Sequence, residues 1–208
     1  MHSYFITPAD LTQGCFAERG PVEYTIYTIL ILRGNFMKSS VRMMARASLM
    51  TALICLLSPV AIPVGITNLT LQTFAVALTG YLLNPAAAAL SMAAYLLLGA
   101  CGLPVFSGFS GGFGMLLGPT GGFLLAFPLM AWLCARPSSA SRIKRIASGL
   151  AGLLTVYLLG AAGLACSAGI SYPQALAVGA LPFVWKDVLS VIGAEWIARA
   201  LQKRGFLS

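Results

Sequence analysis

Charged residues are scarce in this sequence. They make up 9% of its 208 residues, whereas a typical soluble domain carries about 25%. A globular protein of this length would need many more charged side chains to keep its surface hydrated. Hydrophobic residues reach 59% instead. The composition therefore excludes a soluble globular domain and predicts an integral membrane protein.

Residues that build metal sites and disulfides are also few. The single histidine, His2, lies near the start of the chain, and the five cysteines show no Cys-x-x-Cys spacing. Zinc sites and disulfide frameworks need several such residues at short, regular spacings. No Gly-Lys-Ser/Thr sequence follows a glycine-rich stretch, which excludes the usual phosphate-binding loop. We therefore expect no metal site, no cofactor and no ATP hydrolysis in this chain.

Acidic residues are few as well: five against 13 basic ones, for a formal net charge of +8. Most of the basic residues fall into three clusters, at 33–46, 136–145 and 199–204. Basic clusters beside apolar runs are typical of loops held on the cytoplasmic side of a membrane. This pattern indicates a lipid bilayer as the partner, and no nucleic acid.

Long apolar runs predict six membrane spans, since each span needs about 20 apolar residues. The longest run is divided at Asn84-Pro85, because proline starts a new helix well. The expected spans are residues 45–63, 66–83, 86–102, 121–135, 147–166 and 182–201. This count places the basic clusters on one side and the uncharged segments 63–66, 103–120 and 167–181 on the other. We predict an all-α integral membrane protein with six transmembrane helices and both termini cytoplasmic.

Residues 1–36 differ from the rest of the chain. They contain three of the five acidic residues, and their longest apolar run is too short to span a membrane. We interpret 1–36 as a dispensable leader or an over-extended start. Residues 37–208 would then form the six-helix membrane domain.

The glycine-rich segment 102–123 would form an outer loop between the third and fourth helices. Glycine lets the backbone approach a ligand closely, and irregular backbone at membrane depth is tolerated where it lines a cavity. The candidate ligand contacts in this loop are Phe106, Ser107, Phe109, Ser110 and Thr120. The alternative is a tight re-entrant turn packed by its glycines.

Lys186 and Asp187 are charges in the outer half of the sixth predicted span, and Ser190 shares their side of the helix at 3.6 residues per turn. Ionisable residues inside a membrane usually face a cavity or one another. We interpret the three as a binding sector; the alternative is that the two charges reach the interface. Glu195 and Arg199 are four residues apart, which suits an ion pair or a partner contact.

Two further patterns concern helix faces. On the first span, small residues four apart form the pairs Ala47/Thr51 and Ser48/Ala52. Small residues let membrane helices approach closely, either inside the fold or against another protein. The second pattern is a weak repeat, in which the segment 95–103 resembles 157–164, each beginning at a tyrosine. Chance likeness between two Leu-, Gly- and Ala-rich helix ends would also explain it.

Four motifs together resemble the BioY family of biotin-capturing S-components of energy-coupling factor transporters. They are Leu71-Gln-Thr-Phe74, Leu103-Pro-Val-Phe106, Leu117-Gly-Pro-Thr-Gly-Gly-Phe123 and the segment from Pro182-Phe183 to Asp187. The resemblance spans about 38–203, in order along the chain. It implies a multi-pass protein of the bacterial cytoplasmic membrane that binds biotin from outside. It also implies two kinds of partner, a transmembrane coupling subunit and a pair of ABC ATPases.

The resemblance further implies roles for single residues. Asp187 matches a family aspartate and would accept the ureido N–H groups of biotin. Trp185-Lys186 stands where the family has Pro-Gly, and Ser190 stands where it has lysine. Lys186 would then offer the cation for the carboxylate, with Gln72 and Trp185 as further contacts. Two other classes remain open: a stand-alone secondary transporter of a vitamin-like solute, and an intramembrane enzyme using Lys186 and Ser190.

Overall fold

Helices form most of the chain in the computed structural model, which describes residues 41–64, 67–137 and 141–204. The chain divides after Arg42 into two compact units, of which the second begins at Met43. The first helix of this second unit continues to residue 57. The later elements are β1 (Ala61–Val64), β2 (Thr67–Thr70), α3 (Gln72–Leu82), α4 (Pro85–Ala100), α5 (Gly114–Leu117), α6 (Gly121–Ala135), α7 (Arg142–Ala168), α8 (Tyr172–Gly179) and α9 (Val184–Lys203).

The two strands form an antiparallel hairpin that the sequence patterns did not predict. Ala61 pairs with Thr70 and Val64 with Thr67. The predicted first span includes residues 61–63 and the predicted second span includes residues 67–70 as helix ends, with Val64 in the turn between them. The first helix stops earlier, and Pro63 and the β-branched residues around it favour an extended backbone over a helix. The helical fold is confirmed in its broad form, with this hairpin added to it.

Helix boundaries follow local signals in the sequence. The predicted break between the second and third spans is confirmed, since Asn84 caps α4 by accepting a hydrogen bond from the Ala87 N–H at 2.8 Å, with Pro85 in the first turn. α7 begins at Arg142, five residues before the predicted span, and draws two arginines of the second basic cluster into the helix. The predicted outer loop contains the short helix α5, and the last predicted outer segment contains α8.

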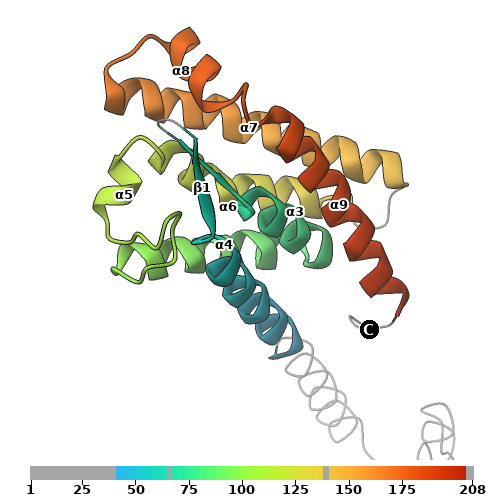
Figure 1. The fold of residues 1–208 in the computed structure, drawn as a ribbon. Helices are drawn as coiled ribbons and strands as arrows, with labels where there is room; N and C mark the ends of the chain where they lie inside the picture. The colour runs from blue at the N-terminus through green and yellow to red at the C-terminus, as the bar shows by residue number, and fades with distance from the viewer. Residues whose placement is uncertain (1–40, 65–66, 138–140, 205–208) are drawn as a thin grey trace, which may run out of the picture. The chain divides into compact units, whose positions relative to one another are not determined.

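Figure 1 shows how these elements are arranged within the unit. α6 packs against α4 on one side and α7 on the other, while α9 packs along α3. α5, α8 and the end of α7 lie toward one end of the helices. The beginning of α7 and the end of α9 lie toward the other. The two ends therefore carry different sets of residues.

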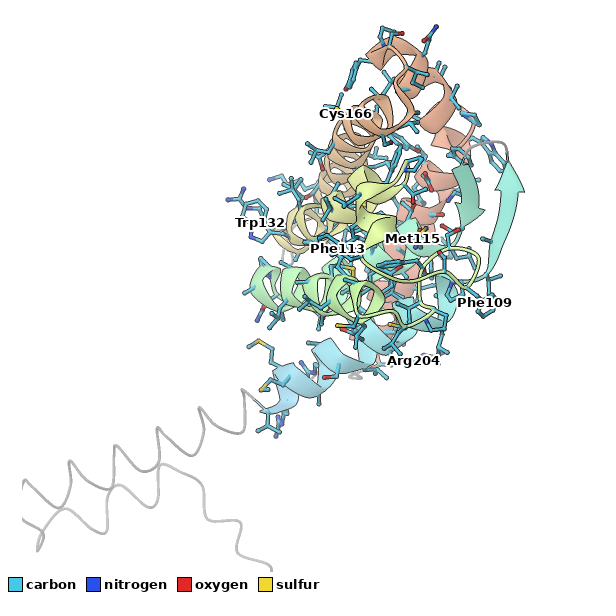
Figure 2. All side chains as sticks on the ribbon, turned by 90° about the vertical axis from the view of Figure 1, so that its left-hand side faces the viewer. Phe109, Phe113, Met115, Trp132, Cys166 and Arg204 are labelled. Carbon is cyan, nitrogen blue, oxygen red and sulfur yellow. The ribbon has the colours of Figure 1, made fainter. Side chains whose placement is uncertain are left out.

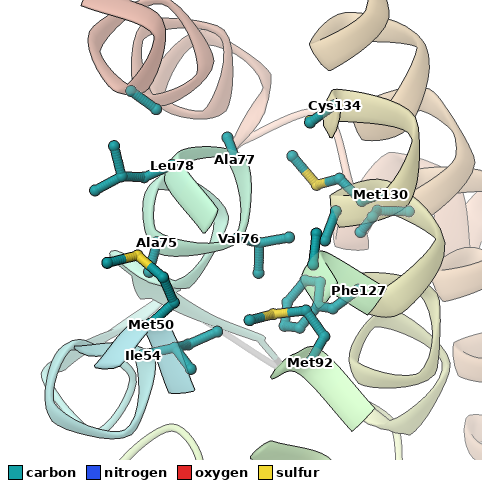
Figure 3. Packing of buried hydrophobic residues seen from close by; sticks show 14 of the residues in the cluster. Met50, Ile54, Ala75, Val76, Ala77, Leu78, Met92, Phe127, Met130 and Cys134 are labelled. Atoms are coloured by element: carbon teal, nitrogen blue, oxygen red, sulfur yellow. The ribbon is translucent and has the colours of Figure 1, made fainter. Parts of the chain in front are cut away.

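The core lies where the first helix, α3, α4 and α6 meet (Figure 3). Ile54, Val76, Met92 and Met130 are fully buried there, one from each of these elements. Alanines and Cys134 fill the remaining space. Small side chains at the contacts bring the helix backbones close together, as in other membrane-helix packing.

Gly80→Ala should destabilise the protein, because α3 and α6 leave no room for a methyl group at this position. An added Cβ would lie 2.6 Å from the Ala131 carbonyl oxygen and would also overlap the Cys134 side chain. Overpacking of this kind costs about 1–3 kcal/mol. The thermal unfolding midpoint of the detergent-solubilised protein should fall. Gly193→Ala on α9 is the matched control, since its Cβ would meet no atom within 4 Å.

Among the described residues, only α7 is long and apolar enough to cross a membrane as a single helix. α8 and α9 pass the same test as a pair, with a bend of 58° between them. α4 and α6 are shorter apolar helices.

Candidate functional site

A cavity opens between the hairpin, α3, the outer loop and the helices α6 to α9. It holds about 680 Å³ of space, part of which is open to solvent. Its apolar wall consists of Phe106, Met115, Phe123, Leu124, Phe127, Val156 and Phe183. Its polar groups are Thr70, Gln72, Thr73, Ser107, Thr120, Tyr157, Lys186 and Asp187. Apolar walls with a few placed polar groups are typical of small-molecule sites.

Asp187 is the most enclosed charge in this cavity, at 4% exposed. The Tyr157 hydroxyl of α7 donates to its Oδ2 at 2.7 Å, and Lys186 Nζ lies 2.5 Å from its Oδ1. Oδ1 accepts no hydrogen bond from the described residues apart from this ion contact. Lys186 Nζ also donates to the Thr70 carbonyl at 2.7 Å, so it ties α9 to the end of β2. Oδ1 is thus a buried acceptor whose charge is balanced by the Lys186 ammonium.

Gln72 belongs to a buried network that adjoins the Lys186 contact through Thr70. Its Nε2 donates to the Ser58 hydroxyl and, at 2.9 Å, to the Tyr95 hydroxyl. Its Oε1 accepts from the Thr70 hydroxyl at 3.2 Å. A primary amide has two N–H donors and two acceptor lone pairs. Both donors are therefore used within the protein, and Oε1 keeps one of its two acceptor lone pairs.

The same network holds the outer loop against the cavity. The Tyr95 hydroxyl is within 3.2 Å of the Val105 carbonyl, and the Tyr95 ring meets the Phe106 ring edge-on with centroids 5.5 Å apart. Phe106 is only 1% exposed and lies against Gly99, where a side chain would overlap its ring. One hydrogen bond and one aromatic contact, both made by Tyr95, thus position the loop residues that line the cavity.

Comparisons with known proteins place this chain in a family. The sequence model of the BioY family matches residues 32–205. The chain belongs to the BioY family. It is 40% identical to the "Biotin transporter BioY" of Thermotoga maritima over 164 residues, which cover 78% of this chain and 96% of that protein. It is 39% identical to the "Probable biotin transporter BioY" of Pyrococcus horikoshii, covering 74% and 93% respectively.

A solved structure resembles the fold of this BioY chain. It is the 2.1 Å crystal structure of the S-component for biotin from an ECF-type ABC transporter. The TM-score is 0.74 at 28% identity, covering 80% of this chain and 93% of that one. BioY proteins are transporter components, so the chain is a membrane protein and not an enzyme.

The structure brings six of the ten predicted ligand residues of this BioY chain to the cavity wall: Gln72, Phe106, Ser107, Thr120, Lys186 and Asp187. The other four are not part of the wall. Trp185 is 64% exposed because one step of about 100° along α9 turns it away from Lys186. Ser190, half-buried, lies beyond the cavity. Phe109 and Ser110 also lie outside the wall.

The backbone turn at Phe109 explains why some residues of the outer loop line the cavity and others are exposed. Phe109 lies in the sharp turn that the Phe106–Ser110 bridge closes, and its φ is 57°. At this turn its side chain is 70% exposed. Figure 2 shows Phe109 at the outer edge of the loop, whereas Met115 lies among the helices. Met115 lines the cavity.

Sequence reasoning missed Tyr157, Thr70 and most of the apolar wall. Tyr157 contacts a residue 30 positions away in the chain, so no local spacing connects the two. One signal was present, because Tyr157 and Tyr95 begin the two copies of the weak repeat. Both hydroxyls bind polar partners at the cavity.

The two small-residue pairs on the first helix differ in exposure. Thr51 is buried and donates to the Ser91 carbonyl of α4, while the Ser91 hydroxyl donates to the Ala47 carbonyl. The pair Ala47/Thr51 therefore packs inside the fold. Ser48 and Ala52 are exposed. They offer an open small-residue face on the same helix.

Proposed function

We propose that this chain is the substrate-binding subunit of a biotin transporter and that it captures biotin in the cavity described above. The observation that carries the proposal is the buried Asp187–Lys186 pair facing a wall of phenylalanines, in a chain of the BioY family. Biotin combines an apolar bicycle and chain with a ureido group and a carboxylate. The cavity supplies a counterpart to each of these.

The ureido group is the part of the ligand that Asp187 would hold. Its N–H groups need acceptors once the ligand is enclosed, and Asp187 Oδ1 accepts no hydrogen bond from the described residues. The phenylalanine wall would cover the thiophane ring and the chain. An ammonium has three N–H donors, and two of those on Lys186 are directed to Thr70 and Asp187. The third would contact the biotin carboxylate.

The proposed arrangement in the membrane keeps six spans: the first helix, α3, α4, α6, α7 and the α8–α9 pair. Both termini lie in the cytoplasm, and the cavity opens to the outside of the bacterial cytoplasmic membrane. The basic residues at the start of α7 and the end of α9 support this orientation, because they gather at the end opposite α5. Residues 1–36, which lie outside the described residues, remain a proposed leader.

Transport would require partners that use ATP. In this proposal a transmembrane coupling subunit and a pair of ABC ATPases supply the energy, and this chain binds no cofactor of its own. A secondary transporter working alone would need ionisable groups along its path. Within the described residues the cavity holds one ion pair, at one level. The ATP-dependent alternative is therefore favoured.

Uptake of labelled biotin tests the proposal. Cells without another biotin uptake system would express this chain alone or together with the coupling subunit and ATPases. Accumulation should require the ATPases and fail with ATPases inactivated in their nucleotide sites. Equal accumulation by the chain alone, sensitive to a proton uncoupler, would support the secondary transporter instead.

The outer loop should be protected by the ligand on its cavity side only. In a chain whose native exposed cysteines are replaced, Ser107→Cys should react with an external thiol reagent more slowly when biotin is present, because Ser107 lines the cavity. Phe109→Cys, at an exposed position outside the wall, should react at the same rate with and without biotin. Equal rates at both positions would show that the loop does not enclose the ligand.

The exposed face of the first helix should serve the coupling subunit. Ser48→Leu should reduce biotin uptake at least about ten-fold while leaving biotin binding unchanged, because a bulky side chain blocks a close helix contact and Ser48 does not line the cavity. Binding to the purified chain and uptake by the assembled transporter would be measured together. Leu49→Met, at an exposed position about 100° further round the same helix, is the control. Loss of binding along with uptake would assign Ser48 to folding.

A further inference from the structure

The end of the second unit opposite the cavity contains a second buried carboxylate, Glu195, which is fully enclosed. Three arginines surround its carboxylate. Arg142 Nε lies 3.1 Å from Oε2, Arg145 Nε lies 3.6 Å from Oε1, and Arg199 Nε bonds to Oε1. One carboxylate thus pairs with three guanidinium groups, and the cluster carries an excess of two positive charges.

Arg145 is used within the protein. It is 2% exposed, and its Nη atoms donate to the Gln202 side chain at 3.2 Å and to the Tyr81 carbonyl at 3.4 Å. Gln202 also donates to this carbonyl, at 2.9 Å. These contacts fasten the end of α3 to α7 and α9. The Arg145–Glu195 pair is therefore the fixed centre of the cluster.

Arg142 and Arg199 differ from Arg145 because their side chains are partly exposed and their Nη donors remain available. Their side chains are 45% and 37% exposed, and each reaches Glu195 through Nε. Their Nη groups make no hydrogen bond with the described residues. The Arg142 guanidinium also stacks over the Trp196 ring, 5.2 Å from its centroid. A buried carboxylate thus orients two guanidinium groups from two helices, with their outer donors directed away from it.

We propose that Arg142 and Arg199 form a binding site for a phosphate group, as presented by an anionic phospholipid or by a soluble phosphate compound. Guanidinium groups bind phosphate through paired N–H donors, a geometry that a lysine ammonium does not reproduce. The excess charge of the cluster favours an anion, and Glu195 is the one carboxylate that the described residues place there. Trp196, 64% exposed beside Arg142, has the amphipathic ring that is enriched at membrane interfaces. This position suits a lipid headgroup.

The test uses the full chain, purified in a neutral detergent and freed of lipid. Phosphatidylglycerol, phosphatidylcholine and inorganic phosphate would be added separately, and binding would be followed by native mass spectrometry and by the thermal midpoint. We expect phosphatidylglycerol to be retained and to raise the midpoint more than phosphatidylcholine does. If inorganic phosphate stabilises the protein as much as phosphatidylglycerol, the phosphate site is supported and its ligand is soluble.

Two variants separate a built site from diffuse attraction. The double variant Arg142→Lys/Arg199→Lys keeps both positive charges but removes the paired N–H donors of the two guanidinium groups. Its affinity for phosphatidylglycerol should therefore fall at least about five-fold. Lys144→Gln removes one exposed charge from the same helix and should leave affinity unchanged. The proposal is overturned if the double variant binds like the original protein, if Lys144→Gln weakens binding equally, or if neither probe is bound. Unchanged biotin binding shows that each variant is folded.

Discussion

Asp187→Asn is expected to weaken biotin binding by about ten-fold or more. The substitution keeps the shape of the side chain but removes the negative charge that pairs with Lys186 and that would face the ureido group. Leaving buried donors without their acceptor costs about 1–3 kcal/mol, and about 1.4 kcal/mol corresponds to a ten-fold change in affinity. Equilibrium binding to the purified variant measures the loss. Asp187 is enclosed by α7 and α9, so its effect should not depend on salt.

Lys186→Met is the matched variant that separates the two halves of the ion pair. If Lys186 contacts the ligand carboxylate, biotin should lose more affinity than a neutral biotin amide. Asp187→Asn should weaken both ligands to a similar degree. Equal losses of biotin and amide in Lys186→Met would make Lys186 the counter-ion of Asp187 alone and would contradict the carboxylate contact. The 2.5 Å contact between the two side chains makes this comparison necessary.

Glu195→Ala is expected to cause the largest loss of stability. Removing one partner of a buried ion pair leaves the other charge without compensation, which costs about 3–5 kcal/mol. Arg145, at 2% exposed, would be that charge. The thermal midpoint in detergent should fall well below that of Arg199→Gln, which removes a half-exposed partner of the same carboxylate. Similar midpoints for the two variants would show that Glu195 does not hold the helices together.

Local signals in the sequence predicted the features that depend on a few neighbouring residues. The break at Asn84-Pro85 follows from a capping side chain and a proline. The position of Lys186 and Asp187 at a cavity follows from the cost of placing charges in an apolar helix. The ion pair between Glu195 and Arg199 follows from their spacing of four residues and is confirmed.

Features that depend on contacts between residues far apart in the chain could not be predicted from local sequence patterns. Tyr157 meets Asp187 only because α7 packs against α9, and Arg142 and Arg145 join Glu195 for the same reason. The hairpin strands contain apolar residues such as Ile62, Val64 and Leu69 beside two apolar runs, so the sequence pattern alone indicates helix ends. Trp185 and Ser190 are close to Lys186 along α9, but neither lines the cavity. Which residues line it depends on the width and depth of the cavity, and these follow from the packing of several helices.

Binding of labelled biotin to the purified full chain, in detergent and without any other protein, tests the central claim most directly. The account predicts saturable binding of one biotin per chain that excess unlabelled biotin displaces and that Asp187→Asn weakens by about ten-fold or more. The thermal unfolding transition of the same preparation establishes that the chain is folded. A folded chain that binds no biotin, or that binds it equally well with Asp187→Asn, would contradict the account.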